Sequence, residues 1–366
     1  MHSPDSGGVK HARPRLAVSS CLLGQAVRYD GRHKRHEWLV GTLGRCVDFV
    51  PLCPEVAIGL GIPREPVHLT GDPEHPRVRA VSNPDRDVTA DLQAEGHAVA
   101  AALGGVSGYV FKSRSPSCGL FHVDVLTESG RTVRSGHGVY SRIIEQAHPC
   151  LPLEEESRLD DSALRENFVN RLYTCQRWLS LCAAGLSAQR LLDFHARHKY
   201  LLLAHSPDGC RRLERLLSGL RDADLFVLAR DYLAGLMTGL MQDSGTTRHI
   251  NVLQHILGYL RRSIAASDKA ELLAVLEATV TGKFRLSYRS CVCGGTSTAA
   301  LMSTSACSGT SGRILMNWNC AIICDDCRHF ACLGVTVRRM YSGNLGMPGF
   351  RYRNGWICSR ERDPRC

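Results

Sequence analysis

Three cysteines in the first 120 residues each follow a short apolar run that is typical of a β-strand. Cys21 follows LAVSS, Cys53 follows VDFVPL, and Cys118 follows GYVFK after a short turn sequence. In open α/β sheets, ligand sites assemble at the carboxyl ends of the strands, so these thiols could meet in space. Three thiolates at one place form a soft-metal site that suits zinc or an iron–sulfur cluster, and three protein ligands leave one position open for a substrate. The alternative is that each cysteine is a small buried hydrophobe, because no CxxC pair accompanies them.

A largely parallel sheet would position these cysteines. From Leu16 onward the sequence alternates apolar runs and a helical pattern, in the order LAVSS, VDFVPL, VTADLQAEGHAVAAAL, GYVFK and HVDVLT. The helical pattern ends at Gly104-Gly105, which is a typical stop signal. This alternation predicts an α/β N-terminal domain.

The strings around the cysteines resemble those of a known family. SSCLLGQAVRYDGRHK, CPEVAIGLGIPREPV, FKSRSPSCG and GHGVYSR occur over about residues 15 to 148, and in this order they resemble the thiouracil desulfurase-like family. The resemblance implies that Cys21, Cys53 and Cys118 hold a 4Fe-4S cluster with one open iron. It also implies that this iron takes the sulfur atom of a small thiolated base such as 2-thiouracil, and that the products are the oxo base and sulfide.

The same resemblance implies two catalytic helpers, Glu55 and Ser115. Replacing C=S by C=O requires a thiophile, a group that moves a proton at the ring nitrogen, and a positioned water. Burial beside the cluster could raise the pKa of Glu55 enough for the proton transfer, and Ser115 could hold the base or the water. Ser113 and Ser117 lie in the same loop, and without the resemblance Glu55 would be assigned to the surface and Ser115 to a turn.

Two polar segments lie near the predicted site in sequence. Arg28, Asp30 and Lys34 follow Cys21 and either line the pocket or belong to a solvated basic loop. His68 and the segment LTGDPEHPRVRAVSNPDRDV predict a loop, rich in proline and aspartate, that folds over the site as a lid.

The second half of the chain predicts an all-α helical domain. The acidic stretch LEEESRLDDSALRENF, with Asp160-Asp161, predicts a linker and a helix N-cap around residues 150 to 162, and Ser187 is a plausible cap for a later helix. FHARHKYLLLAHSP and HINVLQHILGYL resemble the YbgA-like domain over about residues 188 to 282, and this resemblance implies no activity. Structural or substrate-contacting roles are favoured over metal binding because no Glu-x-x-His motif accompanies the domain's histidines. These histidines are His195, His198, His205, His249 and His255.

The last 84 residues differ from the rest. They hold nine of the 17 cysteines and carry a net charge of +8, whereas residues 1–282 carry +2. The segment has neither helical nor strand periodicity, and its Cys324 to Cys327 pair lacks the spacing of a zinc ribbon. Met316 to Cys320, read one base out of register, give Glu-Leu-Glu-Leu, which fits the expected end of a YbgA-like domain. We therefore expect a frameshift near residue 283 and an out-of-frame, disordered tail.

Composition and charge narrow the function classes. Hydrophobic residues make up 44% of the 366 residues, which suffices for two cores. A net charge of +2 over the first 282 residues is no footprint for nucleic acid, and the absence of an apolar leader or long apolar span predicts a cytoplasmic protein without a membrane segment. The oligomeric state stays open. The competing class is a non-enzymatic module in which the three cysteines bind zinc and the helical half binds a partner protein.

The predicted organisation is therefore as follows. The expected segments are a disordered N-terminus (1–14), a desulfurase-like domain (15–150), a linker and helix (151–187), a helical domain (188–282) and the tail (283–366).

Overall fold

The computed structural model describes residues 13–244, 248, 251–252, 288–292, 298–303 and 313–316. The α/β fold followed by helices, as predicted from the sequence, is confirmed. Its centre is a sheet of four parallel strands in the order β2-β1-β5-β8. These strands are β1 (Arg15–Ser19), β2 (Asp48–Leu52), β5 (Gly108–Phe111) and β8 (Leu153–Glu155).

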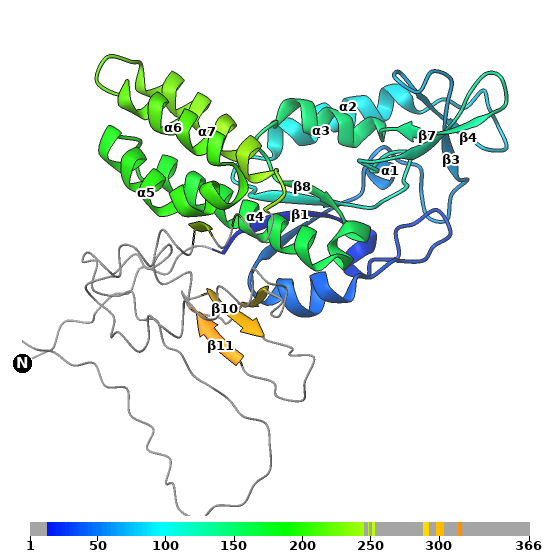
Figure 1. Cartoon of the computed structure of the whole chain (residues 1–366). Helices are drawn as coiled ribbons and strands as arrows, with labels where there is room; N and C mark the ends of the chain where they lie inside the picture. The colour runs from blue at the N-terminus through cyan, green and yellow to red at the C-terminus, as the bar shows by residue number, and fades with distance from the viewer. Residues whose placement is uncertain are drawn as a thin grey trace, which may run out of the picture.

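The parallel sheet is covered by helices on both faces (Figure 1). One face of β1 places Leu16 and Val18 against Phe168 and Leu172 of α4 (Ser162–Ala183). On the other face, residues of β1 and β5 pack on the paired helices α2 (Thr89–Ala102) and α3 (Val139–Ala147). Burial on both faces explains why β1 and β5 read as continuous apolar runs rather than as alternating patterns.

A second, mixed sheet lies beside the first domain's helices, in the order β4-β3-β6-β7. Its strands are β3 (Val67–Thr70), β4 (Arg77–Ala80), β6 (Val123–Leu126) and β7 (Thr132–Gly136). The prediction that this segment is a loop is wrong. Its strands β3 and β4 form an antiparallel hairpin, in which His68 pairs with Arg79. Its Leu69 and Val78 are buried, so the alternating apolar residues of this segment outweigh its prolines and aspartates.

The segment expected to be a linker contributes to the first domain. β8 adds the fourth strand to the parallel sheet directly after residue 152, and α4 fills one face of that sheet. Asp161 caps α4 as predicted, since its carboxylate accepts the N–H groups of Ala163 and Leu164. The three glutamates of this segment, Glu154 to Glu156, are buried, so the change in composition at residue 150 is not a boundary of the sheet.

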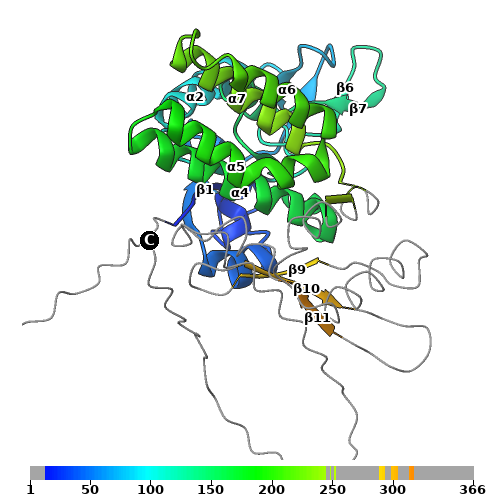
Figure 2. The same cartoon turned by 60° about the vertical axis from the view of Figure 1, so that its left-hand side comes forward.

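Helices α4 to α7 pack side by side (Figure 2). After α4 come α5 (Ala188–His205), α6 (Pro207–Ser218) and α7 (Leu225–Leu240). Ser187 caps α5 as predicted. Their core includes Trp178, Phe194 and Tyr232, whose rings are in contact. His249, His255 and the rest of the helical pattern predicted between 253 and 282 lie outside the described residues.

Short elements complete the described chain. They are η1 (Ser20–Leu23), η2 (Trp38–Thr42), η3 (Leu43–Arg45), α1 (Pro54–Ala57) and η4 (Glu156–Asp160). In the segment predicted to be an irregular tail, three strands pair antiparallel in the order β11-β10-β9: β9 (Tyr288–Val292), β10 (Thr298–Ser303) and β11 (Arg313–Met316). The remainder of that tail lies outside the described residues, and the frameshift stays a prediction about the gene. Within the described helices, none is long and apolar enough to cross a membrane.

Candidate functional site

The three cysteines predicted to converge lie at the carboxyl ends of three adjacent parallel strands. Cys21 lies in η1, two residues after β1, and Cys53 directly follows β2 and caps α1. Cys118 lies in the loop after β5. Because β1 is hydrogen-bonded to β2 on one side and to β5 on the other, the three chain segments leave the same edge of the sheet next to one another.

The thiols lie within electrostatic reach of one another. Burial, reinforced by the charge of Cys53, raises the pKa of the Cys21 thiol to about 11. Burial is also the largest cause of the raised pKa of Cys118, followed by the negative charges of Glu55, Cys53 and Cys21. Burial raises the pKa of Cys53 as well. Burial is thus the main cause of all three raised pKa values, and the charge of Cys53 adds to the raised pKa of both Cys21 and Cys118.

This donor set fits an iron–sulfur cluster by its chemistry. Cys21 and Cys118 are buried, Cys53 is half-buried, and all are free thiols. No group of three or more His, Cys, Asp or Glu side chains in the described part of the chain could hold a metal ion, although the three thiols influence one another's pKa.

Glu55 projects from α1 toward the cysteines and is held from both sides. Its side chain is 14% exposed and pairs with Arg64, whose Nη2 and Nε lie 2.6 and 2.9 Å from Oε2. The other oxygen, Oε1, accepts a hydrogen bond from the Ser117 hydroxyl at 2.9 Å. The charge of Glu55 contributes to the raised pKa of both Cys53 and Cys118. Glu55 is therefore hydrogen-bonded to the loop that carries Cys118, and its catalytic role stays a prediction.

Arg64 and Ser117 were not predicted as site residues. Arg64 is 5% exposed at its side chain and also donates through Nη1 to the carbonyl oxygens of Val27 and Gly61. It thereby links the segment after Cys21 to the segment after Cys53. A single arginine in the turn sequence GIPREP could have been noticed, but nothing in the sequence identifies its partner.

The serines of the Cys118 loop have different partners. Ser115 Oγ accepts the N–H groups of Ser117 and Cys118 at 3.3 and 3.1 Å, so it shapes the turn that carries the cysteine. Its own hydroxyl hydrogen is not used in either bond, since both are donated by backbone. Ser113 is bonded to Glu156, and Ser117 to Glu55. The role of Ser115 toward substrate stays a prediction.

The polar residues after Cys21 are partly tied to the site. Arg28 forms an ion pair with Asp30 at 3.4 Å, and its charge acts to lower the pKa of Cys21. Lys34 is connected by its backbone, because its N–H donates to the carbonyl oxygen of Cys21.

Three of the five histidines for which structural or substrate-contacting roles were predicted lie in the described part of the helical domain, and all three are buried. His195, His198 and His205 are buried on α5. Burial lowers the pKa of His198 to about 3, and its Nδ1 lies 2.8 Å from the carbonyl oxygen of Phe194, on whose ring it stacks. His195 Nδ1 lies 3.2 Å from the Tyr232 hydroxyl. These contacts support the structural role that the sequence analysis favoured over metal binding.

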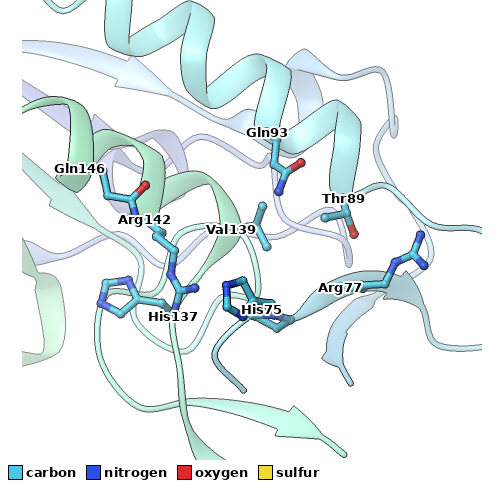
Figure 3. Close-up of a pocket in the computed structure, with 9 residues that line it drawn as sticks. His75, Arg77, Thr89, Gln93, His137, Val139, Arg142 and Gln146 are labelled. Carbon is cyan, nitrogen blue, oxygen red and sulfur yellow. The ribbon is translucent and has the colours of Figure 1, made fainter. Parts of the chain in front are cut away.

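A separate cavity of about 400 Å³ is lined by residues of the β3–β4 hairpin, of α2 and of α3 with the segment before it (Figure 3). Its lining includes His75, Arg77, His137 and Arg142 and none of the three cysteines. Arg77 pairs with Asp87 at 2.7 Å, and His137 lies 3.6 Å from Glu145. Arg77 is thus paired with a carboxylate, whereas Arg142 donates to the backbone carbonyl oxygen of Glu74.

Comparisons with known proteins match the two halves of the chain to two families. Residues 16–156 match the family model described as 2-thiouracil desulfurase, and residues 199–288 match a protein of unknown function (DUF1722). The uncharacterized protein YbbK of Bacillus subtilis (strain 168) is 34% identical over 142 residues, which are 36% of this chain and 90% of the relative. The uncharacterized protein YbgA of Escherichia coli (strain K12) is 28% identical over 127 residues, which are 34% of this chain and 72% of the relative.

A solved structure, the 4Fe-4S-dependent thiouracil desulfidase TudS, shares 30% sequence identity with the chain. The match covers 42% of this chain and 98% of that one, with a TM-score of 0.33.

The chain belongs to the 2-thiouracil desulfurase family through its α/β domain, and a DUF1722 domain of the YbgA type follows. Both resemblances expected from the sequence motifs are confirmed. Membership in this family supports desulfuration as the general class of reaction.

Proposed function

We propose that the α/β domain removes sulfur from a small thiolated nucleobase such as 2-thiouracil, using a 4Fe-4S cluster held by Cys21, Cys53 and Cys118. The net reaction consumes one water, replaces C=S by C=O and releases hydrogen sulfide, so it requires no external oxidant or reductant. The observation that supports this proposal best is that three thiols and one carboxylate follow adjacent parallel strands in a chain of the 2-thiouracil desulfurase family.

Bound by three thiolates, the cluster would supply an iron without a protein ligand, which attracts sulfur and polarises the C=S bond. The burial of Cys21 and Cys118 keeps bulk water away from their side of the site. The thiols are protonated in the metal-free chain, because their pKa values are raised, so they release protons when they become ligands.

In this proposal Glu55 accepts a proton from the water that attacks the thiocarbonyl carbon. A carboxylate has about four lone-pair sites, of which Arg64 occupies two on Oε2 and Ser117 occupies one on Oε1. One site on Oε1 has no hydrogen-bond partner among the described residues and would accept the proton of an attacking water. In this arrangement Arg64 fixes the carboxylate, and the Ser115 hydroxyl can donate to the base or the water.

Anaerobic reconstitution with iron and sulfide tests the proposal directly. We expect about four irons and four sulfides per chain, with charge-transfer absorbance, and sulfide release from 2-thiouracil in equal amount to uracil formed. Cys53→Ser should lose both the cluster and the activity, and Cys182→Ser, which changes an exposed thiol of the helical half, should keep both. A chain that binds stoichiometric zinc and no iron and sulfide would refute the proposal in favour of a zinc-binding module.

Glu55→Gln separates the proton-transfer role from cluster binding. The amide keeps the size of the side chain but cannot accept the proton, so we expect a normal cluster and a rate reduced about 10²-fold or more. Full activity in this variant would remove Glu55 from the mechanism and leave the cluster assignment intact.

A further inference from the structure

The loop that carries Cys118 is bound at both ends by two consecutive buried carboxylates. Glu155 ends β8 and Glu156 begins η4, so both lie at the carboxyl end of the fourth parallel strand, next to β5. Their residues are 4% and 8% exposed. This is the same sheet edge from which the three cysteines leave, although the acidic sequence of the segment resembles a linker.

Glu156 binds the first end of the loop. Its Oε2 accepts the Ser113 N–H at 2.6 Å, and its Oε1 accepts the Ser113 hydroxyl at 2.8 Å and the Lys112 ammonium at 2.5 Å. The Lys112 N–H in turn donates to the Ser19 hydroxyl at 3.0 Å, and Ser19 is also hydrogen-bonded to the Cys118 thiol. Charges on Lys112 and Glu156 both influence the pKa of Cys21, so this bonded group lies beside two of the three thiols.

Glu155 binds the second end of the loop. Its Oε1 accepts the N–H groups of Leu120 and Phe121 at 2.8 and 3.2 Å. The two carboxylates thus receive backbone N–H groups five residues before and two residues after Cys118, which lies between them. Bonds from a carboxylate to backbone N–H groups are charge-assisted and are stronger than neutral ones.

Each clamped end is followed at once by a residue in a strained backbone conformation. Arg114, after Ser113, has a φ of 57°, and His122, after Phe121, has a φ of 53°. In the described part of the chain, these are the two non-glycine residues with positive φ. Such conformations persist where surrounding bonds hold them, and they gather at functional sites. The carboxylates are the groups placed to hold both.

We propose that Glu155 and Glu156 are positioning residues, which hold the two ends of the Cys118 loop so that its thiol stays in place as a ligand. The proposal rests on the proposed function only in treating Cys118 as a cluster ligand. Loop geometry in the metal-free chain does not depend on any reaction, so the two ideas can fail separately.

The test compares Glu155→Gln and Glu156→Gln with Glu154→Gln as the matched control. Glu154 is adjacent and similarly buried, but its carboxylate pairs with Arg158 and Arg171 and accepts the backbone N–H of Glu155 rather than groups of the Cys118 loop. In the metal-free protein, a thiol reagent and mass spectrometry give the modification rate of Cys118. We expect at least a tenfold faster rate in the first two variants, less than a twofold change in the control, and no change at buried Cys210 of the helical half.

The loaded protein provides a second readout. We expect a chelator to remove iron at least tenfold faster from Glu155→Gln and Glu156→Gln than from Glu154→Gln. Unchanged Cys118 modification and iron loss in folded Glu155→Gln and Glu156→Gln variants would overturn the proposal, as would equal effects in all three. If the wild-type chain binds no cluster and is inactive, but the variants show the expected Cys118 modification rates, the proposed function is overturned and the positioning role of Glu155 and Glu156 is supported.

Hydrogen exchange on the unmodified chain keeps the proposal testable if the variants do not fold. The backbone amides of Ser113, Leu120 and Phe121 should be protected at least a hundredfold relative to free peptide. Exchange of these amides at the free-peptide rate would show that the carboxylates do not hold the loop.

Discussion

The ion pair between Arg64 and Glu55 should stabilise the fold as well as the site. Both side chains are largely buried, and they meet through two nitrogen–oxygen contacts of 2.6 and 2.9 Å. Removing one partner of a buried pair typically costs about 3–5 kcal/mol, because the other charge stays buried without a partner. We expect Arg64→Met to cost about this amount, and Glu55→Gln somewhat less, since Arg64 retains the carbonyl oxygens of Val27 and Gly61.

The double variant distinguishes this pair from independent contributions. If the loss in each single variant comes mainly from the charge left behind, Arg64→Met combined with Glu55→Gln should cost less than the sum, by about 1–3 kcal/mol. Urea unfolding of the metal-free protein, followed by circular dichroism under reducing conditions, measures the free energies without a contribution from the cluster. The control is Arg134→Met, which breaks an exposed pair with Asp124 and should cost less than about 1 kcal/mol.

Two results would refute the reasoning. A cost for Arg64→Met no larger than for Arg134→Met would mean that the buried pair contributes as little as a surface pair. Strict additivity in the double variant would mean that the two side chains do not stabilise each other, and that Arg64 acts through its backbone contacts alone.

Three further predictions follow from the fold. Burial raises the pKa of Glu166 from its usual 4.5 to about 7, so ionisation opposes folding and the free energy of unfolding falls as pH rises between these values. Glu166→Gln should therefore be more stable than wild type by roughly 3 kcal/mol at pH 8 and nearly equal to it near pH 4.5, and a difference between the two proteins that is the same at both pH values in urea titrations would contradict this. Phe168→Ala should lower the free energy of unfolding of the α/β domain by about 3–5 kcal/mol, and with it the melting temperature, because Phe168 is fully buried against the parallel sheet. A loss of hydrogen-exchange protection confined to the helical half would show that α4 does not belong to that core. Gly138→Ala would place a Cβ 2.5 Å from the Ser117 carbonyl oxygen and should cost about 1–3 kcal/mol and weaken cluster binding, whereas Gly41→Ala, with open space around it, should change neither.

The positions of the three cysteines could be predicted because they depend on local patterns. LAVSS and GYVFK are continuous apolar runs, as strands covered on both faces must be, and the rule that sites lie at carboxyl ends of parallel strands then places Cys21 and Cys118 together. This reasoning requires only that the strands be parallel neighbours, and not their full order in the sheet. The wrong assignment of the lid shows the limit of this reasoning, since turn residues around β3 and β4 concealed a hairpin whose apolar residues alternate.

The charged residues of the site could not be predicted from the sequence, because their roles depend on partners far along the chain. Glu156 is 43 residues from Ser113, and Glu55 is 62 residues from Ser117. Three consecutive glutamates read as a solvated linker, since carboxylates are rarely buried without partners. The partners are backbone N–H groups of a loop whose conformation exists only in the folded domain.

Each of the four parallel strands leads into a segment that contributes side chains to the candidate site. β1, β2 and β5 deliver thiols, and β8 delivers the two carboxylates that bind the loop of the third thiol. The N-terminus of α3 completes this arrangement, because the N–H groups of Tyr140 and Ser141 donate to the Ser117 carbonyl oxygen. Buried charges of this kind add little net stability compared with apolar residues. The presence of these two buried carboxylates at this edge of the sheet is therefore better explained by the position they impose on the Cys118 loop than by a contribution to the stability of the fold.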